Sequence, residues 1–262
     1  MMYKRLGKGA APMDRKTAIW FLPDGIALSR EPRPLMLRDV MFCPVLTWTC
    51  EELAALGVER LFIVSDKMAH DLIRPLVPAD AVLVDGANHA RELLARLDGA
   101  EGEVIVLNGV VLPVGVFSGG AVYAAGASAV CDVLREHGAF AAFPKGAEIL
   151  KGFLPVGDAE ELRAALPMCR QKIVQRHFDA GVEILDLNNT YIDPRVRIGA
   201  GTTLLPGTIL RGNTVIGENC VIGPNAMLTD CTVGDGATVN ASQIDGVTVE
   251  PGARIGPFAN LR

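Results

Sequence analysis

The carboxylates that end or follow apolar strand-like runs are the side chains of this chain best placed to do chemistry. They are Asp24, Asp66 and Asp85. A pair of such carboxylates could divide general acid and base roles, or could hold a divalent cation. Loops that follow strands usually place aspartate there in any case, and no pair stands out. We therefore assign no catalytic residue and no metal ligand from these positions.

The cysteines form no metal-binding or redox pattern. None belongs to a CxxC pair, and no histidine lies at ligand spacing from two of them. Scattered, unpaired cysteines are typical of a reducing compartment, so we expect a cytoplasmic protein without structural zinc. We interpret all six as small apolar packing residues: Cys43, Cys50, Cys131, Cys169, Cys220 and Cys231.

Composition argues against two broad classes of partner. The chain has 262 residues, 50% of them hydrophobic, and a formal net charge of −5. A negative net charge argues against a nucleic-acid groove. The longest apolar run, 104–117, is interrupted by Asn, Gly and Pro and is shorter than the ~20 residues of a spanning helix. We expect neither nucleic-acid binding nor membrane insertion.

Residues 17–157, which follow a basic tail at 1–16, alternate between short apolar strands and amphipathic helices. Such alternation predicts an α/β domain whose parallel sheet is covered by helices on both faces. The stretch from Gly119 to Val130 is ambiguous. The predicted strands lie at 17–22, 60–66, 81–86, 103–109 and 139–143, and the predicted helices at 45–56, 68–76, 88–97 and 132–138.

A linker is predicted at 158–187, and most of it reads as a helix. Asp158 is the expected N-cap, and Glu161 stands three residues later as its reciprocal partner in a capping box. Apolar residues at helical spacing follow, from Leu162 to Phe178.

The repeat that begins near residue 188 is the strongest pattern in the chain. Six residues do not make a whole number of α-helical turns, so the repeat predicts a triangular β-helix with one short strand and one inward aliphatic residue per face. Glycine follows several of these aliphatic residues, and we attribute it to corners that need positive φ. We expect about four coils over 188–262. The aliphatic residues are spaced by six or five: Ile198, Leu204, Leu210, Ile216, Ile222, Leu228, Val233, Val239, Ile244, Val249, Ile255 and Leu261.

The linker and first coils resemble one bacterial family. The segment from MCRQKIVQRHF through NTYIDPRVRIG to VIGPNAML, and the closing IGPFANLR, are similar in order and spacing to GlmU. That family comprises the bifunctional N-acetylglucosamine-1-phosphate uridyltransferase/glucosamine-1-phosphate acetyltransferases. The resemblance extends more weakly through the α/β domain. It implies left-handed coils, a homotrimer assembled through the β-helix, and a role in synthesis of UDP-N-acetylglucosamine, a cell-envelope precursor.

The family's uridyltransferase residues are largely replaced in this chain. A Gly-rich loop with an arginine should follow the first strand, but LPDGIALSR keeps only Gly25 and a lone Arg30. The expected lysine and the two Mg²⁺ ligands fall on Leu35, Val110 and Gly157 respectively. The short segment between Val110 and Gly157 also leaves little room for the family's sugar-binding lobe. The resemblance therefore implies a uridyltransferase domain that has lost its activity.

A weaker echo of the family's base-binding stretch GTAHA occurs at 86–90. Its threonine is replaced by Ala87. The alternative interpretation is a helix N-terminus that is capped by Asn88.

The family's acetyltransferase half binds acetyl-CoA, and its catalytic histidine belongs to coils beyond those that match this chain. Only Arg262 matches a substrate contact, an arginine that binds the sugar phosphate; the alternative is a surface arginine. The resemblance implies acetyl-CoA and Mg²⁺ for the complete family enzyme, and a sugar phosphate as ligand. It implies no cofactor within this chain.

We interpret the chain as the front part of a glucosamine-1-phosphate acetyltransferase with an inactive uridyltransferase domain, and we expect this chain alone to catalyse neither reaction. A non-catalytic scaffold or regulatory hexapeptide-repeat protein is the alternative. An active uridyltransferase is the third hypothesis, and the Leu35, Val110 and Gly157 replacements oppose it.

Overall fold

The computed structural model describes residues 16–23, 33–97, 101–115, 120–138 and 143–262. These residues form two compact units. The first contains the described parts of 1–27, 53–109 and 119–150, and the second contains the described parts of 28–52, 110–118 and 151–262. Across the described residues, no helix has both the length and the hydropathy that crossing a membrane requires.

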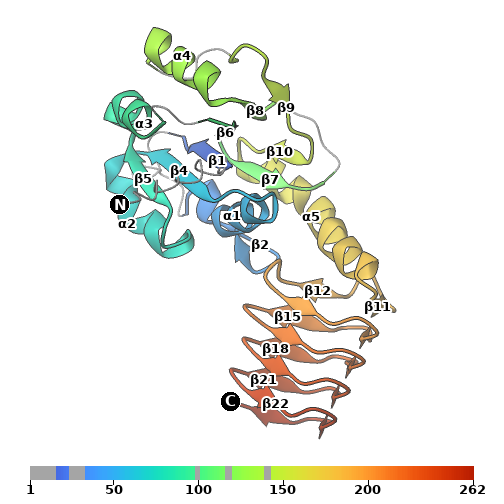
Figure 1. Cartoon of the computed structure of the whole chain (residues 1–262). Coiled ribbons are helices and arrows are strands. Elements are labelled where there is room, and N and C mark those ends of the chain that lie inside the picture. The colour runs from blue at the N-terminus through green and yellow to red at the C-terminus, as the bar shows by residue number, and fades with distance from the viewer. Residues whose placement is uncertain (1–15, 24–32, 98–100, 116–119, 139–142) are drawn as a thin grey trace, which may run out of the picture. The chain divides into compact units, whose positions relative to one another are not determined.

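The first unit is an α/β domain built on a six-stranded sheet with the order β5-β4-β1-β6-β8-β9 (Figure 1). β5, β4, β1 and β6 are parallel, as predicted. The strands are β1 Thr17–Phe21, β4 Arg60–Ser65, β5 Val82–Asp85, β6 Glu103–Asn108, β8 Val122–Gly126 and β9 Glu148–Ile149, and the helices are α2 His70–Ile73, α3 His89–Leu97 and α4 Ala127–His137.

Two strands at one edge of this sheet depart from the predicted parallel pattern. β8 runs antiparallel to β6, and β9 runs antiparallel to β8. A parallel neighbour needs a crossover that is usually helical, whereas the described part of the connection from β6 to β8 holds a strand, β7 Val111–Pro113. The ambiguous stretch before residue 130 is therefore β8 and the start of α4. Most of the strand predicted at 139–143 lies outside the described residues.

Side chains alternate between the two faces of the sheet along each strand, and those on the face under α3 and α4 are apolar. Every second residue of the central strands points to this face, as a pleated strand requires. Leu93 and Leu97 of α3 and Val130 and Leu134 of α4 complete the cluster. Gly138 ends α4 with φ +64° at its C-cap, which is the helix stop that the sequence predicts.

The second unit begins with a small hairpin and contains the long helix before the β-helix. β2 Asp39–Val40 pairs with β3 Cys43–Pro44, and β7 pairs with β10 Phe153–Pro155. Helix α1 spans Val45–Ala55, and α5 spans Ala159–Asp179.

The predicted N-cap of α5 is confirmed. One carboxylate oxygen of Asp158 accepts from the N–H groups of Glu160 and Glu161, each at 2.8 Å. The Glu161 side chain accepts from the N–H of Gly157 at 2.7 Å, one residue earlier than a capping box predicts. Both carboxylates also lie at the positive end of the helix dipole.

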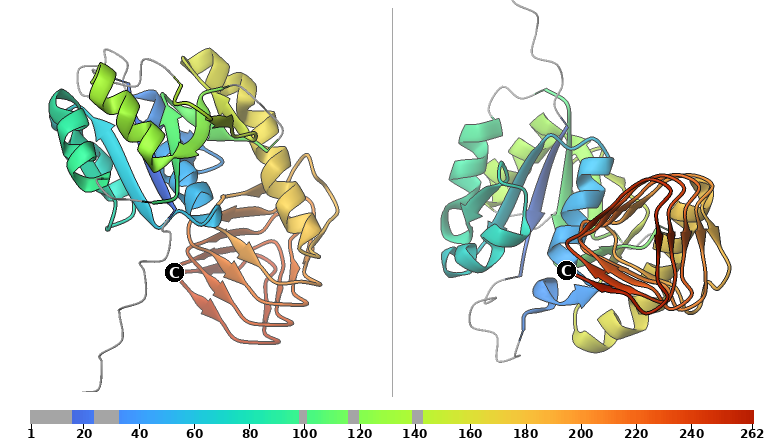
Figure 2. Two further views of the ribbon diagram at one scale, coloured as in Figure 1. Left: turned by 45° about the horizontal axis from the view of Figure 1, so that its top comes forward. Right: turned by 90° about the horizontal axis from the view of Figure 1, so that it is seen from below.

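The C-terminal strands stack into three parallel sheets, the arrangement of a left-handed parallel β-helix. Seen from below, the coils superimpose on a triangular outline (Figure 2). There are four complete coils and two strands of a fifth. The strands are β11 Glu183–Ile184, β12 Tyr191–Ile192, β13 Arg197–Ile198, β14 Thr203–Leu204, β15 Ile209–Arg211, β16 Val215–Ile216, β17 Val221–Ile222, β18 Met227–Thr229, β19 Thr232–Val233, β20 Thr238–Val239, β21 Gln243–Asp245, β22 Thr248–Val249, β23 Arg254–Ile255 and β24 Asn260–Leu261.

The predicted aliphatic residues do fill the interior of this prism. From Leu204 to Val249 each of them is at most 4% exposed. Shortened repeats keep them in register, because Ile222 pairs with Val239 and Val239 pairs with Ile255 although the intervals fall below eighteen residues. The five-residue spacings are therefore shorter corners, and the inward row continues unbroken.

A second inward row precedes the aliphatic residues by two positions, and the sequence analysis did not single it out. Its members are small and buried, and their hydroxyl or thiol groups bond to backbone carbonyls. Thr208 Oγ1 donates to Leu205 O at 2.7 Å, and Cys220 Sγ lies 3.3 Å from Gly234 O. All six cysteines are buried and free of disulfides, which fits the packing role predicted for them. The row comprises Thr190, Val196, Thr202, Thr208, Thr214, Cys220, Ala226, Cys231, Ala237 and Ser242.

The explanation offered for the corner glycines is correct at only some positions. Gly223 and Gly256 have φ +105° and +95°. Gly199, Gly217 and Gly234 do not have positive φ, so conformational freedom does not account for them. There the reason is steric: a Cβ on Gly217 would lie 2.8 Å from the backbone nitrogen of Asp235 in the next coil, and one on Gly234 would lie 2.5 Å from that of Pro251.

Candidate functional site

In the α/β unit, the carboxyl ends of four parallel strands meet at one edge of the sheet. This edge is where doubly wound folds generally bind ligands. Ser65 ends β4, opposite Asp85 at the end of β5, and Asn108 ends β6. The ring of His89 lies 5.6 Å from that of Phe21, the last residue of β1, in an edge-to-face arrangement. The edge thus gathers a hydroxyl, an imidazole and an amide.

Three buried polar atoms in this unit have no hydrogen-bond partner among the described residues. They are Ser65 Oγ, His70 Nε2 and His89 Nε2. The other ring nitrogen of His89 lies 2.6 Å from Gly86 O, which orients the ring. Orphaned buried polar atoms are rare in native proteins because each costs about 1–3 kcal/mol. Two of the three residues, Ser65 and His89, lie at the carboxyl edge of the sheet, and this marks the edge as a candidate small-molecule site.

Residues 86–90, which weakly match the family's base-binding stretch, form the start of a helix. A 3-10 turn, Gly86–Asn88, precedes α3, and Asp85 caps it by accepting from the N–H of Ala87 at 3.1 Å. The cap predicted at Asn88 is therefore wrong, because the turn begins two residues earlier than the apolar pattern indicates. His89, the first residue of α3, is the part of this stretch that lies near the sheet edge.

The resemblance predicts the uridyltransferase lysine and Mg²⁺ ligands at three positions. The residues found there cannot bind phosphate or metal through their side chains. Leu35 begins a 3-10 turn, and Val110 is 5% exposed. Gly157 only donates its N–H to Glu161. Gly25 and Arg30 lie outside the described residues. Within the described part of the chain, no group of three or more His, Cys, Asp and Glu residues is arranged to hold a metal ion.

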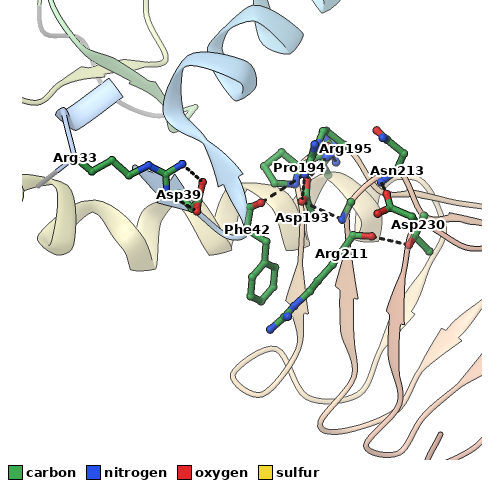
Figure 3. Close-up of polar contacts among 12 residues, drawn as sticks. Arg33, Asp39, Phe42, Asp193, Pro194, Arg195, Arg211, Asn213 and Asp230 are labelled. Atoms are coloured by element: carbon green, nitrogen blue, oxygen red, sulfur yellow. Dashed lines mark hydrogen bonds and ion pairs between the residues drawn. The ribbon is translucent and has the colours of Figure 1, made fainter. Parts of the chain in front are cut away.

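In the second unit, a fully buried carboxylate organises the first two coils. Asp193 is 0% exposed and follows the inward Ile192. It accepts from Arg195 Nε at 3.0 Å and Nη2 at 2.7 Å, from the N–H of Arg195 at 3.0 Å and from that of Gly212 at 3.1 Å (Figure 3). The hydrogen bond to Asp193 raises the pKa of Arg195 above its usual range.

A second arginine of the same sheet packs against the β2–β3 hairpin. The guanidinium carbon of Arg211 lies 4.4 Å from the centre of the Phe42 ring. Arg195 Nη2 also donates weakly to Phe42 O at 3.5 Å. Figure 3 shows both arginines on neighbouring coils with Phe42 beside them. This cluster was not predicted from the sequence. Its one local signal is the charged pair of the YIDPR segment, directly after an inward aliphatic residue.

Arg262, the predicted sugar-phosphate ligand, lies exposed directly after β24. Leu261 pairs with Ile244, so Arg262 follows in line with Asp245 and, through the strand register, with Thr229 and Arg211. The structure thus places Arg262 in the same column as Arg211, several coils away. The role of Arg262 as a sugar-phosphate contact stays a prediction.

The fold and its repeats define the class of the C-terminal region: a hexapeptide-repeat β-helix. Residues 195–230 and 213–242 match the family model described as Bacterial transferase hexapeptide (six repeats). The inward rows and stacked parallel strands of the structure agree with that match.

Comparison with curated relatives shows which hexapeptide-repeat proteins this chain resembles. The chain is 47% identical over 107 residues, or 41% of its length, to "Bifunctional protein GlmU" of Nocardia farcinica. It is 38% identical to the proteins of the same name from Thermoanaerobacter pseudethanolicus over 132 residues and from a Geobacillus species over 133 residues. The matches cover about half of this chain and 22%, 28% and 29% of those relatives. The C-terminal half of the chain is GlmU-like.

Proposed function

We propose that this chain supplies a GlmU-like acetyltransferase-type β-helix that acts in UDP-N-acetylglucosamine synthesis. The observation that carries the proposal is the 47% identity to the Nocardia farcinica protein, which accompanies the hexapeptide repeats. Acetyl transfer in that family uses acetyl-CoA and glucosamine-1-phosphate. In this proposal the coils assemble into a homotrimer, and Arg262 helps to position the sugar phosphate.

A segment exchange tests this role directly. If the matching 107 residues of the Nocardia farcinica protein are replaced by those of this chain, we expect the chimera to keep acetyl transfer within about tenfold, since buried rows of equivalent size preserve the coil. Thiol release from acetyl-CoA is the assay, and sedimentation checks that the chimera stays trimeric. A trimeric chimera without acetyl transfer would contradict the proposal.

The same proposal holds that residues 17–157 transfer no uridylyl group. Departure of pyrophosphate builds negative charge that cations must stabilise. The residues at the matching lysine and Mg²⁺-ligand positions are Leu35, Val110 and Gly157. None of them offers a charged side chain.

We therefore expect the chain to release pyrophosphate from UTP and N-acetylglucosamine-1-phosphate at least about 10³-fold more slowly than the Nocardia farcinica protein under identical Mg²⁺ conditions. A coupled pyrophosphate assay with both purified proteins makes the comparison. Turnover near that of the relative, lost on substitution of Asp66, would reveal a relocated site.

The alternative function is a non-catalytic regulatory or scaffold protein whose α/β unit binds a small molecule. The unpartnered atoms of Ser65, His70 and His89 favour it. It becomes the better account if the segment exchange abolishes acetyl transfer while the chimera remains folded and trimeric.

A further inference from the structure

A groove in the second unit is lined by two arginines of the first two coils, Arg195 and Arg211. Its volume is about 600 Å³, within the range of small-molecule sites. The β2–β3 hairpin, α5 and strands β12, β15 and β18 contribute to its walls. The residues that matter here are Asp39, Phe42, Tyr191, Arg195, Arg211 and Asp230. We call it the Arg211 groove.

Arg211 is a cation without a carboxylate partner in the described structure. Its Nε is buried and has no hydrogen bond to a described residue. The guanidinium is held at the face of the Phe42 ring, 4.4 Å from the ring centre. A guanidinium that is stacked in this way keeps its planar set of N–H donors oriented, which suits bidentate binding of an oxyanion.

Arg195 provides a second, pre-oriented guanidinium in the same groove. Its Nε and Nη2 are held by Asp193, while Nη1 makes no hydrogen bond to a described residue. The side chain of Arg195 is 25% exposed and that of Asp193 is 0% exposed. The buried carboxylate therefore fixes the arginine and leaves one edge of it open to the groove.

The hairpin that carries Phe42 has a strained backbone. Met41 and Phe42, which connect β2 to β3, have φ +48° and +69°. Two-residue hairpin turns with positive φ at both positions favour Gly and Asn, and side chains larger than these are held there only by their surroundings. Such strain is found preferentially at ligand sites. Here it places an aromatic ring against Arg211.

Two carboxylates and a phenol complete the walls of the groove. They indicate which groups, besides a phosphate, a bound ligand would have. Asp230 Oδ1 accepts from the N–H of Asn213 at 2.8 Å, and Oδ2 has no described donor. Asp39 pairs with Arg33. Tyr191 is 36% exposed. Carboxylate oxygens accept from hydroxyl groups, and the faces of aromatic rings pack against ring carbons.

We propose that the Arg211 groove binds a phosphate monoester with a hydroxyl-bearing ring, such as a sugar phosphate or a nucleoside monophosphate. The phosphate contacts the guanidinium of Arg211, Arg195 adds a second positive charge to the same groove, and Asp230 accepts from a hydroxyl of the ring. The proposal does not rest on the acetyltransferase assignment, because the groove is built by the hairpin, α5 and the first coils. A purely structural role for the Arg211–Phe42 stack is the competing explanation.

Titration calorimetry of the full chain at low salt tests the proposal with glucose 6-phosphate, adenosine 5′-monophosphate and inorganic phosphate as probes. We expect a dissociation constant of about 1 mM or lower for at least one monoester. Glucose and adenosine, which lack the phosphate, should not bind measurably. Inorganic phosphate should bind more weakly than the monoester, and equal binding would overturn the role given to Asp230.

Variants separate ligand binding from folding. Arg211→Gln should weaken monoester binding by about tenfold or more, because a charged hydrogen-bonding partner is lost. Arg211→Lys, which keeps the charge but loses the fork, should fall between Gln and wild type and provides the comparison if Gln impairs folding. Arg254→Gln, an exposed arginine of β23, is the matched control and should bind as wild type does. No saturable monoester binding by wild type up to about 10 mM, or equal binding by folded Arg211 variants, overturns the proposal.

Discussion

Replacing Ile222 by asparagine should lower the free energy of unfolding by about 3–5 kcal/mol. Ile222 is 0% exposed, and its strand lies between those of Leu204 and Val239 in one sheet of the β-helix. The substitution leaves an amide without partners in an apolar prism and removes side-chain volume that neighbouring coils cannot fill. A loss of this size is a large share of the stability of a typical domain.

The control for this variant lies four residues away on the same coil. Glu218 is exposed, and its interactions with the neighbouring coils run through its backbone, whose N–H donates to Asp235 and whose carbonyl accepts from Gly236. Glu218→Ala keeps both bonds and should change stability by less than about 0.5 kcal/mol. Urea melts of the two variants make the comparison. Equal losses would show that the inward row has been assigned to the wrong register.

The β-helix could be predicted from sequence because its periodicity is local and one-dimensional. Each face of each coil needs an inward aliphatic residue, so the regular spacing from Leu204 to Val249 predicts the fold directly. The small inward row was missed because Thr, Ala, Cys and Ser share size rather than hydropathy. The steric reason for glycine at position 217 could not be predicted either, because it depends on the close approach of Asp235 from the next coil.

The candidate sites were harder to predict because they depend on contacts between distant segments. Phe42 and Arg211 are far apart in the chain, and their stacking requires positive φ at two residues that disfavour it. At the sheet edge, the parallel direction of the strands follows from the alternation of strands and helices, but the orphaned atoms of Ser65 and His89 depend on which side chains surround them. Sequence patterns indicate the scaffold, whereas the hydrogen-bond partners of a buried atom depend on segments that only the fold brings together.

Asp193→Ala should destabilise the chain by about 3 kcal/mol, the lower end of the range for breaking a buried ion pair. The side chain is completely buried and accepts four hydrogen bonds, three from Arg195 and one from the N–H of Gly212. Its removal leaves the Gly212 N–H without that acceptor and a guanidinium without its counter-charge. Because Arg195 is 25% exposed, water can solvate part of that charge, and this limits the loss.

Denaturant melts of a double-mutant cycle measure the contribution of this pair. Arg195→Met in the Asp193→Ala background should restore part of the lost stability, since no uncompensated cation then remains. Asp245→Ala is the matched control, because Asp245 occupies the equivalent position of the same sheet but is exposed, and it should cost less than about 0.5 kcal/mol. If Asp193→Ala costs no more than Asp245→Ala, the buried pair does not hold the first two coils together, and the fixed orientation of Arg195 in the groove must have another source.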